Sequence, residues 1–444
     1  MENTKNTKLI HFLSDEKVDQ AWRLCGDAHV YYVLSKFIQF LDRSLRWRGE
    51  TYDLQIEKVI PKPIVCGQVL SQPDFIIDRI SVWNGYYSCL AQSSLNSLIG
   101  TSNCNYTMRH YNKHSTSDVL ARVIHPDDHF PTTVLLPEST SFTAEEQSNL
   151  LTEVVETHFQ NRYPLFLKRA YGSGGGADVI KVDNFEQLYI NYTRSSWAVF
   201  HLQEAIDDFE EHIRCMAIGC QILPMKFHMG DFLNRKGFPT AKEYLNSYEP
   251  ELITIDRQNQ ELYQRLSNYV KFNNSYHRWS YASFEALIKN NQIHPIDFAN
   301  PYCDSRFYTL HVHFPWLICA LLRWSSFCAV TGKNLNTDME QQVVLNVLND
   351  PKVSSLEKYQ FAKQTSDAYY DPELFTEFCA ENWSDLDEKM IEFYDRHWHE
   401  VINYALEISY FPQQKKTHYQ SEYQQLMDRY FRRDAKEYLN FNIY

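Results

Sequence analysis

FLKRAYGSGGGADVIKV, residues 166–182, is the stretch on which the fold of this sequence depends. An apolar run predicts a short strand over residues 165–167 that ends at Lys168, and a β-branched run predicts a second strand over residues 179–182. The loop between them carries four glycines in five positions: Gly172, Ser173, Gly174, Gly175 and Gly176. Glycine has no Cβ atom, so the N–H groups of this loop can approach an anion closely, and Lys168 adds a positive charge. The stretch predicts a hairpin whose tip can lie against phosphates.

The order of these parts differs from the two common phosphate-binding motifs. In a Walker loop the lysine follows the glycines and opens a helix, whereas Lys168 precedes them and a strand follows. The spacing G-x-G-x-x-G of dinucleotide-binding folds is also missing. A flexible glycine hairpin without a ligand is the alternative interpretation of this stretch taken alone.

Composition narrows the class of protein. The chain has 444 residues, of which 44% are hydrophobic and 15% aromatic, enough for full cores in two or three domains. The net charge of −13 argues against a nucleic-acid-binding role. Ten scattered cysteines without a C-x-x-C pair fit reduced thiols, and we expect a cytoplasmic protein. The most apolar window, residues 314–330, is interrupted by Arg323 and predicts a buried helix; no membrane association is expected.

The N-terminal quarter predicts a helix followed by a small α/β layer. Apolar residues recur at helical spacing within residues 1–50, which we expect to be helical. Residues 59–69 and 75–82 each read as a short strand.

The middle of the chain predicts alternating strands and helices. A helix start at 143–146 combines the hydroxyl of Thr143 with the early acids Glu145 and Glu146. Asn290-Asn291 predicts the turn of a final hairpin. The expected strands are 132–136, 197–203, 213–222, 282–289 and 293–298, and the expected helices are 115–123, 144–160, 184–192, 260–270, 356–363, 374–378, 390–408 and 419–431.

Residues that can bind phosphates, a nucleoside or metal ions follow one another in a recognisable order over about 190 residues. Lys113 comes first, then Lys168 with its glycine hairpin, then a strand HLQEAI that leaves through Glu204. Next come the acidic residue Glu211, then Arg214, and then a hairpin that carries carboxylates. This order, over roughly residues 80–310, resembles the ATP-grasp superfamily.

The resemblance implies a fold and its division. An α/β (α+β) ATP-grasp fold is expected, with an N-terminal α/β pre-ATP-grasp-like domain over residues 1–111. The ATP-grasp domain would cover residues 112–310, and a helical extension residues 311–444.

The resemblance also implies roles for individual residues. Lys113, Lys168 and the glycine loop would hold the phosphates of ATP, while Arg214 and Lys168 would act on the transferred phosphoryl group. The hinge Glu204, Ala205 and Ile206 would pair with the adenine edge through its backbone, and Glu211 would take the ribose hydroxyls. The metal ligands would be Glu285, Asp297 and Asn300, holding two Mg²⁺ ions or Mn²⁺ in their place.

Two segments within residues 80–310 are each similar to a particular branch of the superfamily. The strand IRCMAIG, residues 213–219, resembles the I-R-C-x-x-x-G strand of the glutamate-ligase branch, the type that modifies ribosomal proteins. The ending IDFANP, residues 296–301, is similar to the I-D-F-x-N-P of a little-described bacterial set of ATP-grasp proteins.

Two positions depart from the family pattern. The usual metal motif is acid-x-Asn, but two residues, Phe298 and Ala299, separate Asp297 from Asn300 here. Two outcomes are open for the second ion: Asp297 holds it with Asn300 placed slightly differently, or it is held only weakly. Glu285 replaces the commoner aspartate at the first metal position, and its longer side chain still reaches.

The implied function is that of an ATP-dependent carboxylate–amine ligase that works through an acyl phosphate. Its carboxylate and amine substrates are unknown and could each be a small molecule or a peptide. One alternative is a phosphotransferase on the same scaffold. Another is a nucleotide-binding scaffold with weak or no turnover, whose C-terminal helices would bind a protein partner or a second copy of the chain. The pairs His311-x-His313 and His397-x-His399 are interpreted as core or interface histidines rather than metal ligands.

Overall fold

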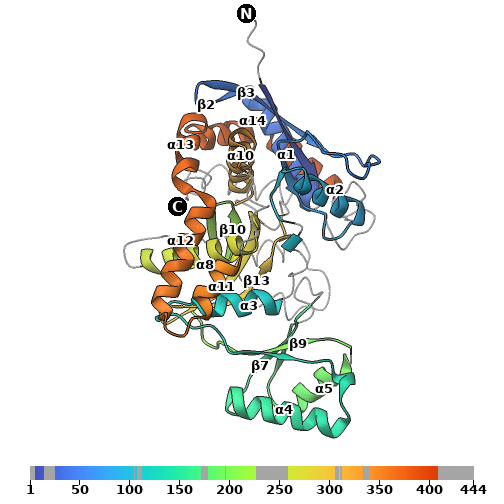
Figure 1. Cartoon of the computed structure of the whole chain (residues 1–444), viewed down its shortest axis with the longest axis vertical. Helices are drawn as coiled ribbons and strands as arrows, with labels where there is room; N and C mark the ends of the chain where they lie inside the picture. The colour runs from blue at the N-terminus through green and yellow to red at the C-terminus, as the bar shows by residue number, and fades with distance from the viewer. Residues whose placement is uncertain are drawn as a thin grey trace, which may run out of the picture.

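A computed structural model gives the structure of the protein, and it contains three β-sheets stacked along the long axis of the molecule (Figure 1). It describes residues 6–14, 26–104, 106–107, 113–171, 179–195, 197–226, 259–305, 310, 313–333 and 341–408. The N-terminal sheet lies at one end of the view in Figure 1, the sheet containing β7 and β9 lies at the other, and the sheet containing β10 and β13 lies between them. The expected α/β architecture is confirmed.

The N-terminal sheet is mostly parallel, with strand order β2-β3-β1-β4-β5. Its strands and helices are β1 (Asn6–Leu13), α1 (Gly26–Leu41), β2 (Ser44–Trp47), β3 (Glu50–Lys58), β4 (Phe75–Asp78), α2 (Gly85–Asn96) and β5 (Gly100–Thr101). Parallel strands need crossover connections, and α1 supplies one between β1 and the β2–β3 pair.

Two predictions for this sheet are wrong. Residues 1–50 are not helical throughout, because the run ending at Leu13 is buried as the central strand β1 and the chain after α1 pairs as β2. Residues 59–69 form no strand, since Pro61 and Pro63 lack the N–H groups that a ladder needs. The expected strand over residues 75–82 ends early, at Asp78, whose carboxylate accepts hydrogen bonds from the N–H groups of Ile80 and Ser81 and turns the chain.

The second sheet, which we call the lid sheet, is antiparallel with strand order β6-β9-β7-β8. Its strands and helices are β6 (Thr133–Leu136), α4 (Ala144–Phe159), β7 (Leu165–Arg169), β8 (Val179–Val182), α5 (Phe185–Arg194) and β9 (Phe200–Glu204). α4 begins at a capping box in which Thr143 and Glu146 satisfy each other's backbone N–H groups, as its sequence predicts. The helices α4 and α5 pack on one face of the sheet (Figure 1).

The central sheet is antiparallel with strand order β11-β10-β12-β13. Its elements are α3 (Lys113–Leu120), the short helix η2 (Ala121–Val123), β10 (Glu211–Ile218), β11 (Gln221–Lys226), α8 (Gln260–Tyr276), β12 (Tyr281–Lys289) and β13 (Gln292–Asn300). The predicted hairpin turn is confirmed, with Asn290 and Asn291 both in the left-handed region. The predicted single strand over 213–222 is wrong, because the chain reverses at Gly219 and returns as β11.

The C-terminal helices enclose the central and N-terminal sheets. They are α10 (Phe314–Thr331), α11 (Gln341–Asn349), α12 (Ser355–Tyr370), α13 (Pro372–Asn382) and α14 (Leu386–Ile408). α10 is the only described helix long and apolar enough to cross a membrane, and 94% of that stretch is buried inside the protein. It therefore forms the core helix that its sequence predicts, while the predicted helix 419–431 lies outside the described residues.

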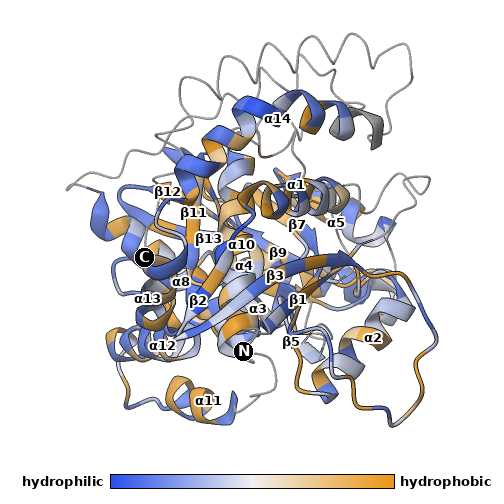
Figure 2. Ribbon diagram, turned by 90° about the horizontal axis from the view of Figure 1, so that it is seen from above, coloured by the Kyte–Doolittle hydropathy of each residue, from blue (hydrophilic) through white to orange (hydrophobic). Residues whose placement is uncertain are grey.

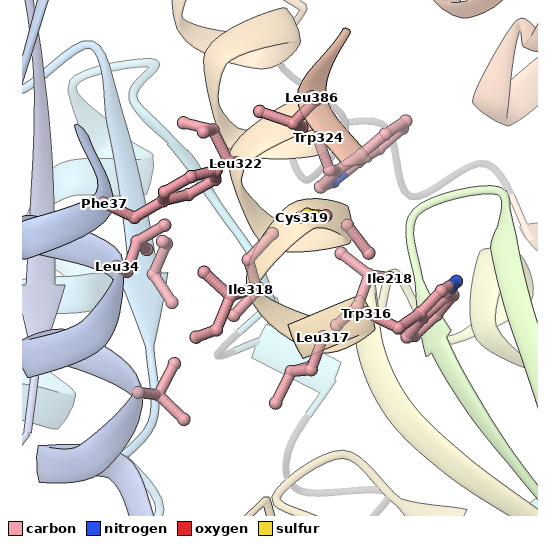
Figure 3. Close-up of a cluster of buried hydrophobic side chains, with 14 of the residues drawn as sticks. Leu34, Phe37, Ile218, Trp316, Leu317, Ile318, Cys319, Leu322, Trp324 and Leu386 are labelled. Atoms are coloured by element: carbon pink, nitrogen blue, oxygen red, sulfur yellow. The ribbon is translucent and has the colours of Figure 1, made fainter. Parts of the chain in front are cut away.

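α10 joins the N-terminal sheet to the central sheet. Figure 2 shows it among the other elements, next to α1, and Figure 3 shows Leu34 and Phe37 of α1 facing Ile318 and Leu322 of α10. Its other side covers one end of the central sheet, where Ile218 belongs to the same core. The opposite face of the central sheet is covered by α8 and α12. The division into three domains at residues 111 and 310 stays a prediction.

Replacement of Gly219 by alanine tests how tightly α10 seats on the central sheet. Gly219 has φ +60°, and a Cβ atom there would lie 2.2 Å from the ring of Trp324. Gly332→Ala is the matched control, because Gly332 has φ +68° but nothing within 4 Å of that position. The left-handed backbone should cost each variant about 1–2 kcal/mol in the free energy of unfolding, and overpacking should cost Gly219→Ala about 1–3 kcal/mol more. Urea denaturation measures both, and equal losses would contradict this packing.

Candidate active site

The half of the central sheet that α10 leaves uncovered carries the charged residues of the candidate site. Successive side chains in a strand point to opposite faces. On β10, Cys215 and Ala217 belong to the core under α8, so His212 and Arg214 lie on the other face. Arg214 is paired across the ladder with Glu285 of β12, and Glu285 is paired with Asp297 of β13. The two predicted metal carboxylates therefore lie side by side on the face that carries Arg214.

One of two register shifts between β12 and β13 explains how the unusual spacing of Asp297 and Asn300 is accommodated. Glu285 is opposite Asp297 and Ser283 is opposite Asn300, so three residue steps on β13 match two on β12. The register shift absorbs the extra residue and brings Asn300 to the same face as Asp297. A second shift lies between Pro295 and Asp297, where a proline without an N–H is tolerated.

Both predicted phosphate lysines reach this face from neighbouring elements. The ammonium group of Lys113, at the start of α3, lies 3.2 Å from the Asp297 carboxylate. Lys168, on β7 of the lid sheet, donates to the side-chain oxygen of Gln203 at 2.6 Å and to the carbonyl of Ile296 at 3.5 Å. The structure thus brings together Lys113 and Lys168 with the carboxylate hairpin, as the sequence predicts.

Counting only the residues that the structure describes, this group carries more positive than negative charge. Three cations, Lys113, Lys168 and Arg214, meet two carboxylates, and the Arg214 Nε lies 3.9 Å from Glu285. Burial, followed by the charge of Lys113, lowers the pKa of Lys168 to about 8. Burial alone would raise the pKa of Asp297, but Lys113 and Lys168 outweigh it and hold that pKa below its usual value. The net positive charge suits an anionic ligand.

The predicted hinge lies at the end of β9, next to the central sheet. The Glu204 carboxylate accepts hydrogen bonds from the N–H of Thr132 at 3.0 Å and contacts His129 Nε2 at 2.9 Å. Beyond the strand, Ala205 and Ile206 make no backbone hydrogen bond to any described residue. Their N–H and C=O groups can therefore pair with the edge of a ligand, as the hinge prediction requires.

Some predicted residues do not join this group. Glu211 lies on the face that α8 covers, where its carboxylate contacts Tyr263 at 3.1 Å and Lys226 at 3.2 Å. Its predicted ribose contact is therefore not supported by its position. The glycine loop, Gly172, Ser173, Gly174, Gly175 and Gly176, lies outside the described residues. Asn300, by contrast, does join the site, because the register of β13 places it opposite Ser283.

Three polar residues of the site were not predicted from the sequence. His212 Nε2 lies 3.3 Å from the Glu285 carboxylate, two residues before Arg214 on the same strand face. Gln203 is held by Thr133 and in turn holds Lys168. His201 contacts His114 at 3.1 Å, and burial followed by the charges of His114 and Lys168 lowers the pKa of His201 to about 3, so it is neutral. Because alternate residues of a strand share a face, the position of Arg214 could have identified His212 from the sequence. Gln203 and His201 could not be identified in this way, because their place in the site depends on contacts with other elements.

Comparisons with known proteins give matches among solved structures only. No protein-family model and no curated protein match the chain. D-alanine–D-alanine ligase from Bacillus anthracis is 13% identical, with a TM-score of 0.43 over 74% of this chain and 100% of that one. The RimK domain ATP-grasp protein from Sphaerobacter thermophilus is 13% identical, with a TM-score of 0.41 over 66% and 92%. A RiPP-associated ATP-grasp ligase from Chryseobacterium gregarium, solved with ADP and a leader and core peptide, is 9% identical, with a TM-score of 0.42 over 82% and 97%.

At TM-scores below 0.5 and identities of 9–13%, these likenesses carry no argument about fold, activity or branch. The sheet topology and the convergence of both lysines on the carboxylate hairpin are what the sequence resemblance predicts. These features agree with the ATP-grasp fold that the resemblance implies.

The donor atoms of this site fit Mg²⁺ together with a nucleotide. Within the described ranges no three His, Cys, Asp or Glu side chains form a metal cage. Mg²⁺ is usually held by one or two carboxylates together with substrate phosphates, so a complete protein cage is not required. Glu285 and Asp297, opposite each other across the ladder, supply the carboxylates, and the carboxamide of Asn300 makes no hydrogen bond to a described residue.

The pKa of Lys168 predicts a pH dependence for anion binding. Because a bound polyphosphate would raise this pKa from about 8, the lysine should take up a proton on binding above that pH. ATP affinity should be full below pH 8 and fall by up to about tenfold per pH unit above it. Calorimetry at pH 7.5 and pH 9 in buffers of different ionisation enthalpy measures this uptake. Proton uptake on ATP binding that is no larger at pH 9 than at pH 7.5 would contradict the assignment.

Proposed function

We propose that the protein is an ATP-dependent ligase that joins a carboxylate to an amine. The observation that carries this proposal is the convergence of Lys113 and Lys168 on the paired carboxylates Glu285 and Asp297, next to Arg214. Such a group can hold a triphosphate, a divalent ion and a second anion in one place against their mutual repulsion.

The order of side chains along the site face supports one orientation for the nucleotide. Starting from the turn of the hairpin, the face carries the buried pair Leu287 and His294, then Glu285 and Asp297. Consecutive pairs lie about 7 Å apart along the strand. The turn end contacts the segment that follows the hinge, since the Lys289 ammonium donates to the Asp207 carbonyl. Adenine would therefore lie near Leu287 and the hinge, and the phosphates near the carboxylates.

Each charged group has a distinct role in this proposal. Glu285, Asp297 and Asn300 would hold Mg²⁺, which when bound screens the phosphate oxygens from one another and from an incoming nucleophile. Lys113 and Lys168 would bind phosphate oxygens, and Arg214 would stabilise the phosphoryl group during its transfer. Gln203 orients Lys168 through its side-chain oxygen.

The proposed reaction has two steps. The γ-phosphoryl group of ATP moves to an oxygen of the substrate carboxylate, giving ADP and an acyl phosphate. The nitrogen of the amine then attacks the acyl carbon, phosphate leaves with its bonding electron pair, and the nitrogen loses a proton to solvent. Formation of ADP without an amide product would favour a phosphotransferase instead, and tight binding of Mg·ATP without turnover would favour a scaffold.

Substitution of Lys168 and Asp297 tests the two halves of the site. Lys168→Ala should abolish measurable ATP binding because it removes the ammonium group that β7 places beside the carboxylate hairpin. Asp297→Asn should keep most of the adenine-dependent affinity and lose Mg²⁺-dependent turnover, by about a hundredfold or more. Calorimetry and ADP release measure these effects.

The control for Lys168→Ala is Lys181→Ala, because Lys181 is an exposed lysine on the adjacent strand β8, opposite Phe166. It should leave both measurements unchanged. Full nucleotide affinity in Lys168→Ala would show that the phosphate site lies elsewhere, and unchanged turnover in Asp297→Asn would remove that carboxylate from the metal site.

A further inference from the structure

The three residues that follow Asn300 are each held by the end of β4 in the N-terminal sheet. Arg79 donates to the carbonyl of Pro301 at 3.3 Å and to the carbonyl of Cys303 at 2.6 Å. Between them, the hydroxyl of Tyr302 donates to the Asp78 carboxylate at 2.9 Å. Asp78 and Arg79, at the end of β4, thus hold residues 301–303, which directly follow β13.

The two side chains that make these contacts, Arg79 and Asp78, are buried. Arg79 is 2% exposed and Asp78 is inaccessible to solvent. The guanidinium group of Arg79 also lies 4.0 Å from the ring centroid of Tyr281, the first residue of β12. Buried donors and acceptors are costly to leave unpaired, so residues 301–303 have little freedom to move away from β4.

A second residue of the N-terminal segment joins both ends of the carboxylate hairpin. The Asn103 side chain donates to the carbonyl of Pro301 at 2.7 Å and to that of Tyr281 at 3.1 Å, and it accepts the N–H of Tyr281 at 3.1 Å. The first residue of β12 and the residue just past β13 are therefore held at one point. The extra residue of the bulge lies between that point and Asp297.

We propose that Arg79 is a positioning residue that fixes Asn300 as an oxygen ligand for the divalent ion. This inference rests on the proposed function. A bulge leaves a strand end with more than one way to place its last side chain. By holding the carbonyls of Pro301 and Cys303, Arg79 selects the register in which Asn300 lies opposite Ser283, beside Glu285. The parallel N-terminal sheet would thereby control the metal site without touching the ion.

The test measures Mn²⁺ binding by electron paramagnetic resonance in the presence of a saturating non-hydrolysable ATP analogue. Arg79→Lys keeps the charge but cannot reach both carbonyls, so the dissociation constant for Mn²⁺ should rise about tenfold or more. The affinity for the analogue without Mn²⁺ should stay within about twofold, because the lysines that bind phosphate are untouched. Tyr302→Phe, a milder change at the same grip, should shift Mn²⁺ affinity in the same direction and by less.

A double-mutant cycle separates positioning from general destabilisation. In an Asn300→Ala background, Arg79→Lys should produce no further loss of Mn²⁺ affinity, because both changes act through one ligand. Arg323→Lys is the matched control: Arg323 is a buried arginine of α10 that pairs with Asp387 at 2.7 Å, and its replacement should lower the melting temperature without changing Mn²⁺ affinity.

The outcomes that overturn the inference differ from those that overturn the function. Wild-type Mn²⁺ affinity in both Arg79→Lys and Tyr302→Phe, or an undiminished effect of Arg79→Lys in the Asn300→Ala background, would refute the positioning role alone. Absence of Mn²⁺ and analogue binding in the wild type would overturn the proposed function and this inference with it.

Discussion

An excess of positive charge on one half-buried sheet face is the constraint on which the site depends. Within the described part of the chain, Lys113, Lys168 and Arg214 lie beside the carboxylates of Glu285 and Asp297. Burial lowers the pKa of Lys168, which forms no ion pair with a described carboxylate. A structure stabilised only by its own contacts would pair each buried charge, since an unpaired one costs several kcal/mol. The imbalance is therefore best understood as preparation for a ligand that brings the missing negative charge.

The central sheet meets this constraint by dividing its faces. One face belongs to the core that includes α8 and α12, while α10 covers one end of the other face and the charged residues occupy its other end. Gly219 lets Trp324 of α10 approach the sheet closely. On β10, Met216 and Ile218 belong to the core that contains α10, and Arg214 follows on the same face, so core packing and the candidate site share the same strands.

Much of this arrangement could be predicted from the sequence, because local patterns determine it. The two short strands β7 and β8, the capping box at Thr143 and the turn at Asn290-Asn291 each depend on a few adjacent residues. The strand β1 was mistaken for helix because its burial comes from pairing with distant strands. The role of the bulges could not be found, since a register is a relation between strands. The grip of Arg79 on residues 301–303 joins segments more than 220 residues apart.

A crystal structure with Mn²⁺ and a non-hydrolysable ATP analogue tests the central claim most directly. We expect the anomalous signal of Mn²⁺ between the carboxylates of Glu285 and Asp297, and phosphate oxygens within hydrogen-bonding distance of the Lys113 and Lys168 ammonium groups. A nucleotide bound away from this face, or Mn²⁺ held by other side chains, would contradict the account.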